Sequence, residues 1–271
     1  MRHARTLTSL LFAAATMSCG DASSPSAPDQ KLLVPDGPQL ITSGRPTGTD
    51  YGGVGALLAD VGNNLTVDYL CSGSLISPTV FLTAGHCIGP AGTVYYISFA
   101  PDVIPLPPIS QLIKSSVAFK STTDDIGVII LPAGSTIGVP VYDIPTLGFL
   151  SQLNQRGGLA RETAVLVGYG VASLGRGPLL SGLDGVRKVA TAKILYLLGR
   201  QIVIADAHGQ SGQGGTCSGD SGGPVFLEGQ DPDLIVAITS FGFPAGCHAF
   251  GVYVRIDTPT ALAFLGQFVG L

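Results

Sequence analysis

Ser221 stands in a run of residues that suits a nucleophile. Residues 219–224 read Gly-Asp-Ser-Gly-Gly-Pro, and glycines on both sides of a serine let the backbone approach a substrate closely. A serine hydroxyl becomes an effective nucleophile only beside a base and a site that stabilises the oxyanion. Taken alone, the run also fits an ordinary glycine-rich turn. The chemistry therefore depends on a base and an acid elsewhere in the chain.

A histidine and a carboxylate stand where such partners are needed. His86 follows the apolar segment 79–84, within Thr-Ala-Gly-His-Cys at 83–87, and Asp125 begins the run Asp-Ile-Gly-Val. A neutral imidazole can take the hydroxyl proton, and a carboxylate can hold the ring in the required tautomer. Asp124 is a rival for the acid. These residue types together predict acyl-transfer chemistry.

The three motifs, in this order, resemble those of the chymotrypsin and trypsin family of serine proteases, whose marks are TAAHC, DIAL and GDSGGP. The resemblance covers roughly residues 41–270, and Gly85 and Gly127 stand where the family has alanine. It implies a serine endopeptidase in which Ser221 attacks the scissile carbonyl, His86 is the general base and Asp125 orients the imidazole.

The same resemblance implies further roles. The family places the acid directly before its Ile-x-Val strand, which favours Asp125 over Asp124. The backbone N–H groups of Gly219 and Ser221 would form the oxyanion hole. Gly215 would lie at the floor of the primary pocket, where trypsin-like members have an aspartate. Its walls would include Ser240, Gly242 and Gly251.

An open pocket without a carboxylate predicts a preference for uncharged, apolar or aromatic residues, because a desolvated cation would be left unpaired. In addition, Ile41 resembles the start of the mature family members, whose new α-ammonium pairs with the aspartate before the nucleophile, here Asp220. Leu40 precedes it, so an activator that cleaves after Arg or Lys is not expected.

The elements that must position these residues are predicted to be short strands. Apolar runs of four to nine residues are separated by Gly, Pro, Asn and Asp, in a chain with 38 glycines and 19 prolines, which is typical of all-β proteins. A short C-terminal helix is predicted by Thr258 as the cap and Pro259 at the first helical position. The resemblance implies two packed six-stranded antiparallel β-barrels: residues 41–150 with the base and acid, and residues 151–271 with the nucleophile.

The beginning of the chain reads as an export signal. Residues 1–18 place two arginines before an apolar stretch that is too short to span a bilayer. Cys19 follows directly and resembles the lipidated cysteine of bacterial lipoproteins, although Thr16 stands where leucine is preferred. Residues 19–40 read as a flexible tether or propeptide. We expect an exported bacterial protein, either a cell-envelope lipoprotein or a secreted or periplasmic enzyme.

The cysteines fit that location. Cys71, Cys87, Cys217 and Cys247 form an even set in an exported chain, which favours two disulfides, and three pairings are possible. The family resemblance selects Cys71 with Cys87 and Cys217 with Cys247.

Composition removes other classes of function. The net charge is -4 and there is no run of basic residues, so nucleic-acid binding has no electrostatic basis. Cysteine and histidine spacing suggests no metal or other cofactor, and His3, His208 and His248 are assigned no catalytic role. We expect a monomer that acts on proteins or peptides.

Two alternatives remain. An α/β-hydrolase esterase would need the order Ser, acid, His, and only His248 follows Ser221. A catalytically silent binding module on the same fold is also possible in principle, although such proteins usually lack a catalytic residue.

Overall fold

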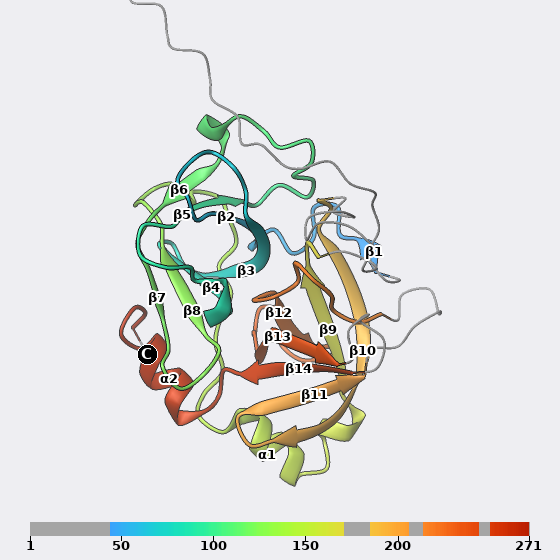
Figure 1. The fold of residues 1–271 in the computed structure, drawn as a ribbon. Helices are drawn as coiled ribbons and strands as arrows, with labels where there is room; N and C mark the ends of the chain where they lie inside the picture. Colours follow the sequence, from blue (N-terminus) through green and yellow to red (C-terminus); the bar gives the residue numbers. More distant parts are fainter. Residues whose placement is uncertain (1–43, 171–184, 206–213, 244–249, 271) are drawn as a thin grey trace, which may run out of the picture.

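The structure is a computed structural model that describes residues 44–170, 185–205, 214–243 and 250–270. It is an all-β protein with two antiparallel sheets and two short α-helices, as predicted (Figure 1). Among the described residues, no helix is long and apolar enough to cross a membrane.

The first sheet, in the order β6-β5-β2-β3-β4-β8-β7, carries the predicted base and acid. Its strands are β2 (Val54–Asp60), β3 (Tyr69–Ser77), β4 (Val80–Thr83), β5 (Val94–Ser98), β6 (Ile113–Ser115), β7 (Ala118–Lys120) and β8 (Gly127–Ile130). Strands β2, β4 and β5 are buried throughout. The short 3-10 helices η1 (Gly85–Cys87) and η2 (Ile109–Gln111) follow β4 and β5.

The first sheet differs in detail from a barrel of six unbroken strands. β6 pairs with β5 and β7 pairs with β8, so these two short strands form opposite edges of a curled sheet. Only Ser116 and Val117 separate β6 from β7. The Ser115 hydroxyl donates to the Ile130 carbonyl and accepts from the Val117 N–H, at 2.6 and 3.1 Å. The segment 113–120 thus contributes one short strand to each edge of the sheet.

The second sheet closes on itself. Its order is β1-β10-β11-β14-β13-β12-β9, and β9 also pairs with β10, so β9 to β14 form a closed barrel. The strands are β1 (Arg45–Pro46), β9 (Thr163–Gly168), β10 (Lys188–Leu198), β11 (Gln201–Ala205), β12 (Pro224–Leu227), β13 (Ala237–Phe243) and β14 (Phe250–Arg255). Helix α1 (Phe149–Gln155) and the 3-10 helix η3 (Leu159–Arg161) precede β9.

The two sheets share one core, and each end of the described chain packs against the sheet that the other half of the chain forms. The largest apolar cluster joins Val54 and Leu82 of the first sheet to Val167 and Ile238 of the second. β1 pairs with β10 of the second sheet, whereas the chain after helix α2 (Pro259–Leu265) returns to the first, since the rings of Phe119 and Phe268 are 5.1 Å apart. The predicted division at residue 150 stays a prediction.

Helix α2 begins as the sequence predicts. The Thr258 hydroxyl accepts from the Ala261 N–H at 3.2 Å, and Pro259 occupies the first turn. The predicted C-terminal helix is confirmed.

Candidate active site

His86 and Asp125 lie in direct contact at one end of the first sheet. His86 belongs to η1, which begins two residues after the end of β4, and Asp125 lies two residues before the start of β8, which pairs with β4. His86 Nδ1 lies 2.8 Å from Asp125 Oδ2, and the His86 backbone N–H donates to Asp125 Oδ1 at 2.7 Å. With Nδ1–H as the donor, the Nε2 lone pair is free to accept a proton.

Gly85 leaves room for this contact. A Cβ at this position would lie 3.0 Å from Asp125 Oδ1 and 3.1 Å from the Ile126 nitrogen. Both distances are shorter than most contacts that Cβ atoms make in proteins. Glycine in place of the family's alanine thus lets η1 lie closely against the carboxylate.

Ser240 supplies a further hydrogen bond to the acid. Its hydroxyl donates to Asp125 Oδ2 at 2.5 Å. Burial raises the pKa of Asp125, but hydrogen bonds from His86 and Ser240 outweigh that effect and the pKa lies below its ordinary value. Asp125 is therefore ionised at neutral pH. The sequence analysis placed Ser240 only in the pocket wall, and no local sequence signal indicated its contact with a residue 115 positions away.

Asp124, the rival acid, points elsewhere. Its Oδ1 lies 3.2 Å from Arg200 Nε, and only 2% of its side chain is exposed. The geometry thus matches the choice of Asp125 as the partner of His86.

The loop that carries Ser221 packs against the strand that leads to His86. The Ser221 carbonyl accepts from the Ser72 N–H of β3 at 2.8 Å and lies 3.8 Å from Cys87 Sγ. Gly222 has a φ of +82°, and a Cβ there would lie 2.2 Å from Thr83 Oγ1 and 2.5 Å from the Ala84 nitrogen. The segment around Ser221 and the segment around His86 are therefore in contact through backbone atoms.

Hydrogen bonds to backbone fix the shape of this loop. The buried carboxylate of Asp220 accepts from the N–H groups of Cys217 and Gly170 at 2.9 and 2.8 Å. The Ser72 hydroxyl donates to the Gly219 carbonyl at 2.8 Å. In the part of the chain that the structure describes, no acceptor is recorded for the N–H groups of Gly219 and Ser221. Both donors of the predicted oxyanion hole are thus available for a ligand.

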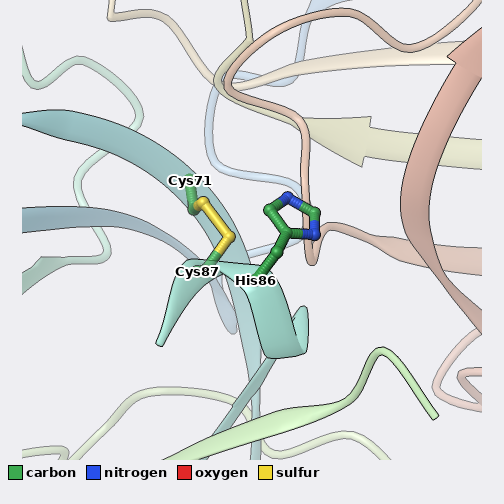
Figure 2. A group of neighbouring side chains, drawn as sticks. All are labelled: Cys71, His86 and Cys87. Atoms are coloured by element: carbon green, nitrogen blue, oxygen red, sulfur yellow. A yellow bond between two sulfur atoms is a disulfide. The ribbon is translucent and has the colours of Figure 1, made fainter. Parts of the chain in front are cut away.

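The cysteine next to His86 forms the predicted disulfide with Cys71 of β3. Figure 2 shows this bridge beside the imidazole. These three residues are the one group of at least three close metal-ligand side chains among the described residues. A metal would need thiolates, and here the sulfur atoms are bonded to each other. Cys217 is also disulfide-bonded, and Cys247, its predicted partner, lies outside the described residues.

The predicted pocket residues are described in part. Gly215 lines a cavity of about 20 Å³ together with Gly44 and Asp220. A Cβ on Gly251 would lie 2.7 Å from the ring of Tyr253, whereas one on Gly242 would have its nearest neighbour among the described residues at 4.0 Å. A larger residue at Gly251 would therefore require the Tyr253 ring to move. Several predicted residues lie outside the described segments: Cys19, Ile41, His208 and His248.

Comparisons with known proteins identify the relatives of this chain. The trypsin family model matches residues 56–262. Brachyurin of Leptuca pugilator is 32% identical over 205 residues, which cover 67% of this chain and 79% of the relative. Glucanase inhibitor protein 2 of Phytophthora infestans is 28% identical over 245 residues, 84% of each chain. Both organisms are eukaryotes, so the comparisons do not support the bacterial origin that the leader suggested.

Solved structures of similar fold include HL collagenase and human heparin binding protein. The first has a TM-score of 0.64 at 18% identity, covering 86% of this chain and 99% of that structure. The second has a TM-score of 0.61 at 17% identity, covering 84% and 96%. At such low identity the likeness extends to the fold alone. The family match, which includes His86, Asp125 and Ser221, shows that the chain belongs to the trypsin family of serine proteases.

Proposed function

We propose that the chain is an active serine endopeptidase. Ser221 attacks the scissile carbonyl, His86 takes the hydroxyl proton and returns it to the leaving amine, and Asp125 stabilises the imidazolium. The observation that carries the proposal is the pair of hydrogen bonds between His86 and Asp125, next to a loop whose oxyanion-hole donors are free. In the proposed intermediate, the N–H groups of Gly219 and Ser221 stabilise the oxyanion.

A catalytically silent binding protein is the second candidate. One finding favours it: a relative that is 28% identical is named a glucanase inhibitor protein. The two candidates differ in chemistry. An endopeptidase turns over peptide and ester substrates, and Ser221→Ala abolishes that turnover. A binding protein turns over neither substrate, with or without the serine hydroxyl.

The proposed primary specificity is for uncharged apolar or aromatic side chains. Gly215 offers no carboxylate at the pocket floor, and Gly242 leaves open space on one wall. The test compares kcat/KM for matched peptides that end in Phe, Leu, Ala or Arg before the reporter group. We expect Phe and Leu to lead. An Arg peptide that is better by tenfold would contradict this specificity.

Activation would place a new N-terminus beside Asp220. In this proposal, cleavage before Ile41 frees an α-ammonium that pairs with the Asp220 carboxylate. Gly44, three residues after Ile41, lines the same small cavity as Asp220, which supports the proposal. N-terminal sequencing of active enzyme tests it, since residues retained before Ile41 would rule it out.

Export is proposed on the leader and on the Cys71–Cys87 disulfide, which suits an oxidising compartment. Lipidation of Cys19 would anchor the enzyme to a membrane through the segment 19–40. Mass spectrometry of the mature protein tests this, and an unmodified N-terminus downstream of Cys19 would refute lipidation.

A further inference from the structure

Asp124 and Arg200 form an ion pair that links the two sheets beside the proposed catalytic acid. Asp124 lies in the turn between β7 and β8, and Arg200 lies in the turn between β10 and β11. Arg200 Nε is 3.2 Å from Asp124 Oδ1, and 52% of the arginine side chain is exposed against 2% for the aspartate. A nearly buried carboxylate thus depends on a cation from the other half of the molecule.

The second oxygen of Asp124 makes this dependence stronger. Oδ2 is buried and has no hydrogen-bond partner among the residues that the structure describes. Asp125, its neighbour, has three donors: the His86 backbone N–H, His86 Nδ1 and the Ser240 hydroxyl. Two adjacent carboxylates are therefore compensated in different ways. Asp125 is stabilised by hydrogen bonds, whereas Asp124 is stabilised by the charge of Arg200.

The two carboxylates and the guanidinium also share one space. A cavity of about 310 Å³ is lined by Asp124, Asp125, Arg200 and Ser240, together with Phe241 and other residues. The shared cavity places the charge of Asp124 beside Asp125, so we expect a change in that charge to act on the pair formed by Asp125 and His86.

The turn that carries Arg200 is held in place by a buried arginine. Arg255 Nη1 donates to the Gly199 carbonyl at 2.9 Å, and the Arg255 backbone N–H donates to the Arg200 carbonyl at 3.0 Å. Arg255 is fixed in turn by two hydrogen bonds to Asp257, at 2.9 and 2.8 Å. These hydrogen bonds anchor the backbone of Arg200. The anchored backbone limits the positions that the guanidinium can take.

We propose that Arg200 is a positioning residue that balances the charge of Asp124, so that Asp125 is the carboxylate whose charge acts on His86. This inference rests on the proposed function of the site. It assigns Asp124, the acid that does not contact His86, a part in the electrostatics of the reaction.

Other titratable groups near His86 do not change in the test that follows. The Tyr69 hydroxyl donates to the Cys87 carbonyl, and burial raises the pKa of Tyr69 to about 12. The Tyr95 hydroxyl accepts from the Gly89 N–H, and burial raises its pKa as well. Lys120 Nζ lies 3.5 Å from the Ile88 carbonyl. Because burial raises the pKa of both tyrosines, Tyr69 and Tyr95 stay neutral between pH 5 and pH 9 in every variant.

The test is an NMR titration of the His86 ring protons in the full-length protein, with His86→Ala identifying the resonances. In Arg200→Gln the unbalanced charge of Asp124 should stabilise the imidazolium and raise the pKa of His86 by about half a unit to one unit. Arg200→Lys, which keeps the charge, and the double variant Asp124→Asn/Arg200→Gln, which removes both charges, should return it to the wild-type value. Arg156→Gln, at an exposed arginine of the second half, is the matched control and should leave the pKa unchanged.

A wild-type pKa in Arg200→Gln, or a shift that persists in the double variant, would overturn the proposal. If Arg200→Gln does not fold, Asp124→Asn alone decides, because the unbalanced arginine should then lower the pKa of His86. An unchanged or raised value in Asp124→Asn also overturns the proposal.

Activity separates this inference from the proposed function. In an active enzyme, the midpoint of the profile of kcat/KM against pH should rise in Arg200→Gln by the amount seen by NMR. If Arg200 had a purely structural role, its replacement would lower kcat/KM equally at every pH. A wild-type protein without hydrolytic activity that still shows the NMR shifts would contradict the proposed function and leave the charge balance intact.

Discussion

The two sides of the candidate active site are held in different ways. On the acid–base side, side chains contact one another: His86 and Ser240 both donate to Asp125, across separations of 39 and 115 residues. In the nucleophile loop, residues 217–224, backbone groups and glycines set the geometry, with the Gly222 N–H donating to the Thr239 carbonyl at 2.8 Å. The acid–base side thus depends on contacts between side chains, whereas the nucleophile loop depends on hydrogen bonds to its backbone and on glycines that leave room for close approach.

The comparison predicts the largest loss for Asp125→Asn. The amide presents an N–H₂ group and favours the wrong imidazole tautomer, so we expect kcat to fall by about 10⁴-fold in an active enzyme. Steady-state hydrolysis of an ester substrate measures it. Asp50→Asn, at an exposed aspartate, is the control. A loss of less than tenfold in Asp125→Asn would contradict the role of this carboxylate.

Gly222→Ala tests the nucleophile loop by adding one methyl group. Gly222 and Gly229 have similar φ values, +82° and +78°, but a Cβ at Gly229 would meet nothing within 4 Å. Gly229→Ala should therefore cost only the backbone strain, about 1–2 kcal/mol of unfolding free energy. Gly222→Ala should cost about 1–3 kcal/mol more, because the methyl group collides with Thr83 and Ala84.

Denaturant titration of the two glycine variants measures this difference. Equal losses for both would mean that space at Gly222 does not matter. Hydrolysis should follow the same order, because displacement of this loop moves Ser221.

Loss of the Cys71–Cys87 disulfide tests the brace between β3 and η1. The bridge spans 16 residues, so Cys71→Ser/Cys87→Ser should lower the unfolding free energy by about 3 kcal/mol, an estimate based on loop-closure entropy. Chemical denaturation of the oxidised wild type and the double variant measures the change. An unchanged midpoint would show that packing alone holds His86 in place.

Ser240→Ala should have the smallest effect. Asp125 keeps both bonds from His86, so we expect kcat/KM to fall by about tenfold, the usual worth of one hydrogen bond to a charged group. A drop as large as that of Asp125→Asn, or no drop at all, would contradict this division of roles.

The same variant changes the dependence of stability on pH. A carboxylate whose folded pKa lies below its ordinary value of about 3.9 contributes stability that is present above that value and lost as the pH falls through the folded pKa. Removing the Ser240 donor brings the pKa of Asp125 closer to the ordinary value. Between pH 7 and pH 3, Ser240→Ala should therefore lose less stability than the wild type, as measured by denaturant titration at both pH values. A larger loss of stability in the variant would contradict the conclusion that the Ser240 hydrogen bond lowers the pKa of Asp125.

The sequence predicted those features that local patterns encode. The all-β fold, the Thr258 cap and the Cys71–Cys87 bridge could be predicted because turn residues, capping residues and family motifs are visible in short runs. The contact between Ser240 and Asp125 and the pair of Asp124 with Arg200 could not, since each joins residues from different sheets. The separation of β6 from β7 also escaped prediction; at this point the Ser115 hydroxyl donates to the carbonyl of Ile130, a residue 15 positions away.

The most direct test of the proposed function is covalent labelling with a fluorophosphonate. Intact-mass analysis should show one adduct on the wild type, at Ser221, and none on Ser221→Ala or His86→Ala, with circular dichroism showing that the variants are folded. Ser218→Ala, three residues before the proposed nucleophile, should label like the wild type. A folded wild type, matured at its native N-terminus, that acquires no adduct would contradict the endopeptidase and favour the binding protein.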